Sequence, residues 1–133
     1  MPTSNKINYK SIVGKVEMWS DTDGISWMLF APGSDITEED MREILVLTQS
    51  TLLSGEQLLA LIDIREMNSI SSEARNLAAA KDLEYMHKAM AIVVTSPAMK
   101  LVANFFIHFH KPPRPTQLFS SPEEAKIWLL TFA

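Results

Sequence analysis

The chain has 133 residues, of which 47% are hydrophobic and 21% are charged, and these proportions are typical of one globular domain rather than of a disordered segment. It contains no cysteine, which excludes disulfides, thiolate metal ligands and cysteine nucleophiles. The formal net charge of −4 argues against a nucleic-acid-binding surface, because binding phosphates requires a dense basic face.

The amino-terminal residues 1–10 are polar and lack the apolar core of a signal peptide, and we expect them to be loosely ordered. The longest mostly apolar stretch, residues 98–109, is interrupted by polar residues and is too short to cross a bilayer as a helix. The sequence therefore predicts a cytoplasmic protein without a transmembrane segment, organised as a single domain over residues 1–133.

The sequence predicts a hairpin, a helix and a strand in the first half of the chain. Apolar runs on either side of Asp23-Gly24 predict a β-hairpin within residues 12–31, since glycine takes a positive φ at low cost. Thr37 and Asp40 form a shortened capping box that begins a helix. The continuous apolar run 58–64 is typical of a strand that is buried on both faces.

Helices and strands alternate through the second half of the chain. The predicted elements are a helix from about residue 71, a strand at 89–95, a helix at about 97–110, a strand at 116–119 and a last helix that begins at the capping box 121–124. The order β-β-α-β-α-β-α-β-α predicts an α/β fold. We expect a mixed, mostly parallel sheet of about five strands, with an N-terminal hairpin and about four helices.

The segment that begins at Asp63 resembles the centre of STAS domains, the family of the anti-sigma-factor antagonists. In that family, a strand that ends in an Asp leads through a loop of fixed length to Asp-Ser-Ser-Gly at the start of the next helix. Here those four positions are Ser71, Ser72, Glu73 and Ala74, so that only Asp63 and Ser72 keep the family residues. The resemblance implies a STAS-like fold, and it implies for Ser72 the role of the phosphorylated switch.

The carboxy-terminal half resembles a more divergent branch of small bacterial proteins with a STAS-like fold. These proteins are common in Bacteroidetes, mostly lack an assigned function, and some are grouped by fold similarity with the CRAL-TRIO lipid-transfer proteins. The resemblance as a whole covers residues 12–130. The segments that carry it in this half are 89–94, 104–106, 111–112 and 115–119.

Polar side chains follow the two buried strands at their carboxyl ends, the edge at which open α/β sheets bind ligands. A phosphate on Ser72 would pair with Arg65 or Arg75 there. The alternative is structural, with the serines capping helices and Asp63 pairing with Arg65. The predicted ligand or partner edge consists of Asp63, Arg65, Ser71, Ser72, Arg75, Thr95 and Ser96.

The helix at 97–110 is apolar nearly all round, so that a second face needs cover as well as the one on the sheet. Three interpretations stay open: burial in the core, self-association as a homodimer, and an apolar ligand such as a lipid. Its candidate contact residues are Leu101, Val102, Phe105, Phe106 and Phe109. His108 and His110 point about 200° apart on a helix, so no metal site is predicted. The eight methionines are scattered and read as core filler.

No nucleophile elbow, phosphate-binding loop or dinucleotide fingerprint occurs, and only four glycines are present to build one. We therefore expect a non-enzymatic regulatory or protein-interaction module of STAS type without a cofactor. It would dock an unknown protein partner, such as a kinase or an anti-sigma-type regulator, and would not bind nucleic acid. The alternative is a carrier or sensor of a lipid or other apolar ligand, and a small enzyme without a recognisable motif ranks last.

Overall fold

The computed structural model describes residues 6–52 and 56–133, apart from the side chains of residues 82 and 84, and its centre is a six-stranded sheet in the order β1-β2-β3-β5-β7-β8. The strands β1, β2 and β3 pair antiparallel, whereas β3, β5, β7 and β8 pair parallel. The expected mixed, mostly parallel α/β sheet is confirmed. The strands are β1 (Ile7–Ile12), β2 (Val16–Ser20), β3 (Ile25–Phe30), β5 (Leu58–Asp63), β7 (His87–Val93) and β8 (Thr116–Phe119).

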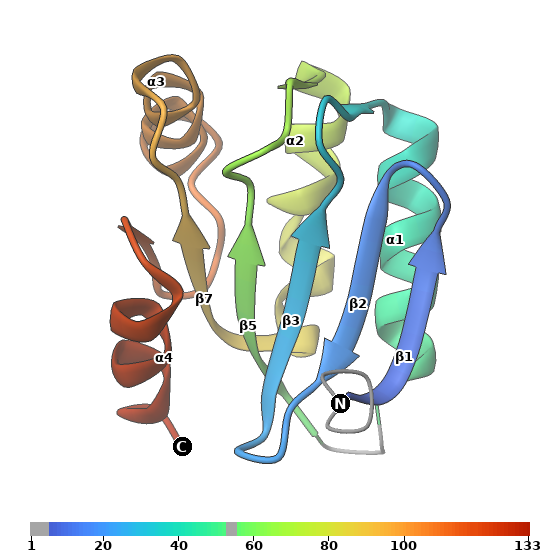
Figure 1. Ribbon diagram of the computed structural model, residues 1–133, viewed down its shortest axis with the longest axis vertical. Coiled ribbons are helices and arrows are strands. Elements are labelled where there is room, and N and C mark those ends of the chain that lie inside the picture. Colours follow the sequence, from blue (N-terminus) through green and yellow to red (C-terminus); the bar gives the residue numbers. More distant parts are fainter. Residues whose placement is uncertain (1–5, 53–55) are drawn as a thin grey trace.

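Four α-helices cover the two faces of this sheet. The helices α1 and α2 lie behind the sheet in Figure 1, and α4 lies in front of it. Buried residues of α3 join the same hydrophobic cluster as those of α1, which places α3 on the α1 side. The helices are α1 (Glu38–Ser50), α2 (Ser72–Ala78), α3 (Pro97–Phe105) and α4 (Pro122–Leu130).

The amino-terminal hairpin forms as expected, with β2 and β3 joined by a turn in which Gly24 has a φ of +85°. The structure differs at residues 7–10, which we expected to be loosely ordered and which belong to β1. This edge strand is polar, its register is irregular between Ile7 and Lys10, and Asn8 has a φ of +56°, so that no regular alternation marks it in the sequence. The same expectation for residues 1–5 lies outside the described residues.

The helices begin where the sequence predicts. The hydroxyl groups of Thr37, Ser71, Ser96 and Ser121 each accept a hydrogen bond from a backbone N–H of the first turn. The third helix continues as a π-helix (Phe106–His110) and ends at Lys111, whose φ of +50° turns the chain. The short strands β4 (Asp35–Ile36) and β6 (Ser69–Ile70), which the sequence did not suggest, form a separate parallel pair.

The sheet separates two hydrophobic clusters, because successive residues of a strand point to opposite faces. In β5, Ala60 and Ile62 face the helices α1 to α3, whereas Leu59 and Leu61 face α4. In β7, Met90 faces the first side and Ala91 the second. The first cluster holds a cavity, which is the candidate site.

Candidate functional site

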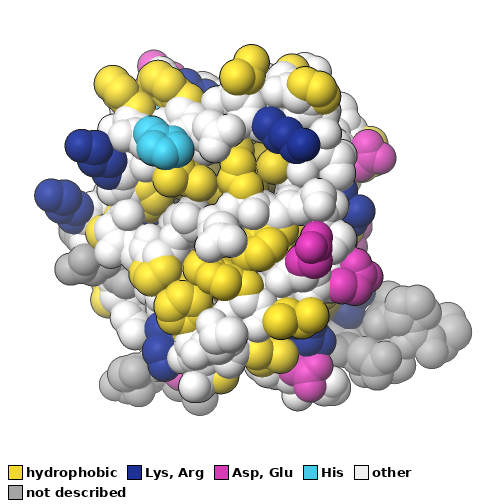
Figure 2. All heavy atoms as spheres, turned by 90° about the vertical axis from the view of Figure 1, so that its left-hand side faces the viewer, with side chains coloured by type: hydrophobic (Ala, Val, Ile, Leu, Met, Phe, Trp, Pro, Cys, Tyr) yellow, Lys and Arg dark blue, Asp and Glu magenta, His cyan; other side chains and the backbone are white. Residues whose placement is uncertain are grey.

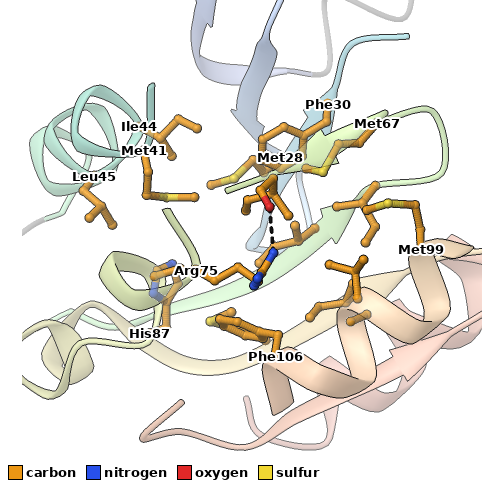
Figure 3. A pocket seen from close by; sticks show the side chains of 18 of the residues that line it. Met28, Phe30, Met41, Ile44, Leu45, Met67, Arg75, His87, Met99 and Phe106 are labelled. Atoms are coloured by element: carbon orange, nitrogen blue, oxygen red, sulfur yellow. Dashed lines mark hydrogen bonds between the residues drawn. The ribbon is translucent and has the colours of Figure 1, made fainter. Parts of the chain in front are cut away.

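A cavity of about 100 Å³ lies between the sheet and the helices α1, α2 and α3. Its floor is formed by side chains of β3, β5 and β7, and α1 and α3 supply its walls (Figure 3). Protein interiors seldom contain voids larger than a water molecule. An engineered cavity of about 150 Å³ is large enough to bind benzene, so that this cavity is of the size that takes a small apolar group.

Methionines gather in the lining of this cavity. Five of the eight methionines in the chain line it, namely Met28, Met41, Met67, Met90 and Met99. Methionine is unbranched and has three rotatable bonds, so a wall of methionines adapts to an occupant at low cost. The sequence predicts that the methionines are scattered core filler. These five do lie in the core, but the fold also brings them together around one cavity.

Some side chains of the third helix and its π-helical end line the cavity, and others lie at the surface of the protein. Val102 and Phe106 line the cavity, together with Ala103. Leu101, Phe105 and Phe109 are exposed instead, with 73%, 46% and 68% of their surfaces accessible, and the rings of the two phenylalanines stack at 4.7 Å. Figure 2 views the side of the molecule that carries α3 and shows hydrophobic side chains at its surface. Burial therefore explains one face of the helix only.

His87 enters the cavity from β7 because of an irregularity in the strand. Leu58 of β5 lies opposite His87, yet Leu59 lies opposite Ala89, so that Lys88 is an extra residue of β7. A bulge of this kind re-aims the side chains before it. His87 consequently lines the same cavity as Met90, and its side chain is 6% exposed. A lysine inside an otherwise buried strand is the sequence signal that would have pointed to this residue.

The imidazole of His87 is neutral at ordinary pH. Its burial, and secondarily the charge of Arg114, lower its pKa to about 3. Its Nδ1 is inaccessible and has no hydrogen-bond partner among the described residues. Buried polar atoms are ordinarily bonded, which makes this atom an exception inside the cavity wall.

Two arginines reach the same cavity. Arg75 extends from α2 into the space between Met28 and Phe106 (Figure 3), and its Nη1 donates a hydrogen bond to the carbonyl of Ile70 at 2.7 Å. Arg114 is 8% exposed and donates from Nη2 to the carbonyl of Ala78 at 2.8 Å. Of the residues on the predicted edge, Arg75 is the one that lines the cavity.

Asp63 and Arg65 form an ion pair at the end of β5. Asp63 is 3% exposed and accepts from Arg65 Nε and Nη2, the latter at 2.7 Å. These hydrogen bonds raise the pKa of the Arg65 guanidinium against a smaller opposing effect of desolvation, and the charges of Asp63, Glu123 and Glu66 raise it further. Asp63 is in register with the residues of β5 that face α4, so that the pair lies across the sheet from the cavity.

The serines of the predicted edge mostly cap helices. Ser71 Oγ accepts from the N–H of Ala74 at 3.1 Å, and Ser96 Oγ accepts from the N–H of Met99 at 3.1 Å. Ser72 is the first residue of α2 and is exposed, as is Thr95. Because Ser71 already caps α2, the hydroxyl of Ser72 is not used for capping.

The histidines at the end of α3 pack against aromatic rings. His110 contacts the rings of Phe105, Phe106 and Phe109, and burial together with the charge of Arg75 lowers its pKa. His108 Nδ1 lies 2.9 Å from the carbonyl of Asn104. Within residues 6–52 and 56–133, no three His, Asp or Glu side chains are placed to hold a metal ion. The same described ranges contain no helix that is both long and apolar enough to span a membrane.

Comparisons with known proteins relate this fold to uncharacterised families. Residues 18–133 match the family model described as Domain of unknown function (DUF7793). The crystal structure of an uncharacterised protein from Shewanella loihica PV-4, of the DUF3478 family and with a SpoIIAA-like fold, is similar with a TM-score of 0.64. It is 22% identical and covers 90% of this chain and 98% of its own. No curated protein matches.

At this level of identity the likeness shows the fold alone. The chain has a SpoIIAA-like fold, which agrees with the predicted STAS-like architecture. The similarity to CRAL-TRIO lipid-transfer proteins stays a prediction.

Proposed function

The chain belongs to the family described as Domain of unknown function (DUF7793), and from this premise we propose that its STAS-type domain binds a small, largely apolar ligand in the methionine-lined cavity and does not transform it. The observation that carries the proposal is the cavity itself. A ligand that fills the space would remove the apolar side chains that line it from water, which is favourable.

The chemistry of the lining favours binding over catalysis. General acid–base catalysis requires a group whose pKa lies near the working pH, and His87 with a pKa of about 3 is unsuited to that role. The hydroxyl of Thr48, which also lines the cavity, donates to the carbonyl of Ile44 at 2.8 Å. The described part of the lining therefore offers shape and hydrogen bonds, and it contains no activated nucleophile.

Methionine methyl NMR tests the proposal directly. With ¹³C-labelled methionine methyl groups, 1-hexanol should shift the resonances of Met28, Met41, Met67, Met90 and Met99. Met86 is 1% exposed and does not line the cavity, so its resonance serves as the internal control. Native mass spectrometry of protein from its own host should show a bound small molecule. If the native mass spectrum shows no bound molecule and hexanol leaves the resonances of the lining methionines unchanged, the proposed ligand binding is wrong.

A second candidate function is the regulatory one that the STAS resemblance implies. The supporting observation is that Ser72 is exposed at the start of α2 while Ser71 makes the cap. A phosphate on Ser72 would lie at the positive end of the helix, three residues before Arg75. Such a switch would control the docking of a protein partner, for example a kinase or an anti-sigma-type regulator.

Phosphopeptide mapping in host cells tests this second candidate. We expect modified Ser72 under some growth condition, and we expect Ser72→Ala and Ser72→Asp to change partner capture in opposite directions. Ser71→Ala is the matched control, because it removes a cap worth about 1 kcal/mol and leaves Ser72 in place. Unmodified Ser72 under every condition, with both variants behaving like wild type, would eliminate the switch.

A further inference from the structure

The polar groups of the cavity are few, and all of the charged ones are cationic. Arg75 and Arg114 line it together with the neutral His87. Among the side chains that the structure describes, no acidic one lines the cavity. An apolar space with positive charge at its wall is complementary to a ligand that has an apolar body and an anionic group.

Arg75 is the cation best placed to meet such a group. Its guanidinium lies in the interior of the cavity in Figure 3, where Nη1 donates a hydrogen bond to the carbonyl of Ile70 and Cζ lies 5.7 Å from the centre of the Phe105 ring. The buried Nε of the same side chain has no hydrogen-bond partner among the described residues. A guanidinium that donates through two nitrogens binds a carboxylate with a fork-like geometry, and Nε is a donor of that kind.

His87 supplies a second polar atom without a hydrogen-bond partner among the described residues. Its side chain is 6% exposed, and its buried Nδ1 lacks a partner in the described part of the chain. A neutral imidazole has one N–H donor and one acceptor nitrogen, so it can bond an acidic ligand without adding another charge to the cavity. Two elements, α2 and β7, therefore each place beside one apolar space a buried polar atom that has no hydrogen-bond partner among the described residues.

The dimensions of the cavity favour a carboxylate over a phosphate. A volume of about 100 Å³ holds a short apolar chain, and the adaptable methionines allow a somewhat longer one. A phosphate monoester carries up to two charges and three acceptor oxygens, which cost more to bury in an apolar cavity than the single charge of a carboxylate. A carboxylate has two oxygens and one charge.

We propose that the ligand of the methionine-lined cavity is a short-chain or medium-chain monocarboxylic acid whose carboxylate is bound by Arg75 and His87. This inference rests on the proposed function, since it names the ligand class of the same cavity. The apolar chain would lie among the methionines and Phe106. Arg75 contributes specificity for the acid, whereas the apolar lining contributes affinity for any chain of suitable size.

Calorimetric titration at pH 7 with sodium hexanoate, 1-hexanol and hexyl phosphate tests the inference. We expect the wild-type protein to bind hexanoate about tenfold or more tightly than hexanol, as a charge-assisted hydrogen bond provides. Arg75→Met should bind hexanol as the wild type does and lose the preference for the acid. Arg42→Met is the matched control, because Arg42 pairs with Glu38 on the exposed side of α1 and should leave both affinities unchanged.

The outcomes separate the two levels of the proposal. Equal affinity of the wild type for hexanoate and hexanol overturns the carboxylate inference and leaves the ligand-binding function standing. A preference for hexyl phosphate over hexanoate also overturns it. Binding of none of the three compounds overturns the proposed function itself. The wild-type comparison needs no variant, so the inference stays testable if Arg75→Met fails to fold.

Discussion

The two faces of the sheet are packed differently, although the same strands supply both. Towards α4, the strands present small side chains such as Ala89 and Ala91, and these, with Ala125 and Leu129 of the helix, are fully buried. Towards α1, α2 and α3, the neighbouring positions carry methionine and isoleucine, and a cavity remains between them. Small residues allow a helix to approach a sheet closely, whereas flexible methionines fill space without specifying one arrangement.

The aromatic residues reinforce this difference. On the α4 side, the rings of Trp128 and Phe132 pack edge to face at 4.9 Å, and that of Phe119 lies 5.5 Å from Trp128. On the cavity side, Phe106 shares its surroundings with Arg75 and His87, which are polar. The α4 face is therefore closely packed, whereas the opposite face leaves a cavity that polar side chains also line.

The largest expected effect comes from truncating one helix residue on each face. Leu129→Ala should lower the free energy of unfolding by about 3 to 4 kcal/mol, because a fully buried leucine leaves a void in rigid surroundings. Met41→Ala should cost about 2 kcal/mol, the low end for such changes, since the adaptable lining can relax. Urea unfolding of both variants measures the difference. Equal costs would mean that the cavity wall is as rigid as the α4 face.

The second effect is on the pH dependence of stability. The pKa of His87 is about 3 in the folded protein and near 6.5 when unfolded, so that the unfolded state takes up the proton first as the pH falls. Its contribution to stability is therefore complete above about pH 6.5 and is lost progressively towards pH 3. Between pH 6.5 and pH 5 the expected loss is about 2 kcal/mol.

Urea unfolding at several pH values, with His87→Leu as the comparison, isolates this contribution. His110 also has a lowered pKa and a loss of the same sign, which persists in the variant. Asp21, Asp35 and Asp40 have lowered pKa values too, and their contributions are lost below their ordinary pKa of 3.8, at more acidic pH. If the free energy of unfolding of His87→Leu falls between pH 6.5 and pH 5 as steeply as that of the wild type, His87 is not buried in its neutral state.

The smallest expected effect, and one that differs in size between the two faces, comes from enlarging an alanine. Ala103 lines the cavity and is 3% exposed, whereas Ala125 is fully buried against the sheet. Ala125→Leu should cost about 1 to 3 kcal/mol through overpacking. Ala103→Leu should change stability by less than about 1 kcal/mol because the new side chain fills existing space. It should also abolish hexanol binding. A large loss of stability in Ala103→Leu would show that the cavity is not available to a side chain.

Much of the architecture could be predicted from local patterns, because those patterns act over a few residues. The Asp-Gly turn, the four capping hydroxyls and the apolar runs predicted the order of the strands and helices, and the structure confirms it apart from the additional strands β1, β4 and β6. The edge strand β1 was not predicted, because four of its six residues are exposed, none is buried and its register is irregular. The ion pair of Asp63 and Arg65 was the structural alternative that the sequence left open at the predicted edge, and the structure shows it.

The candidate site could not be predicted in the same way, because it depends on which distant residues meet. Nothing local indicates that Met28, Met67 and Met99 surround one space, or that Arg75 lies inside it. The direction in which His87 points depends on one extra residue in β7, since a strand alternates with a period of two and a bulge reverses that alternation. Local sequence thus determined the elements and their caps, whereas packing of distant residues on one face of the sheet decided where the cavity lies and which side chains line it.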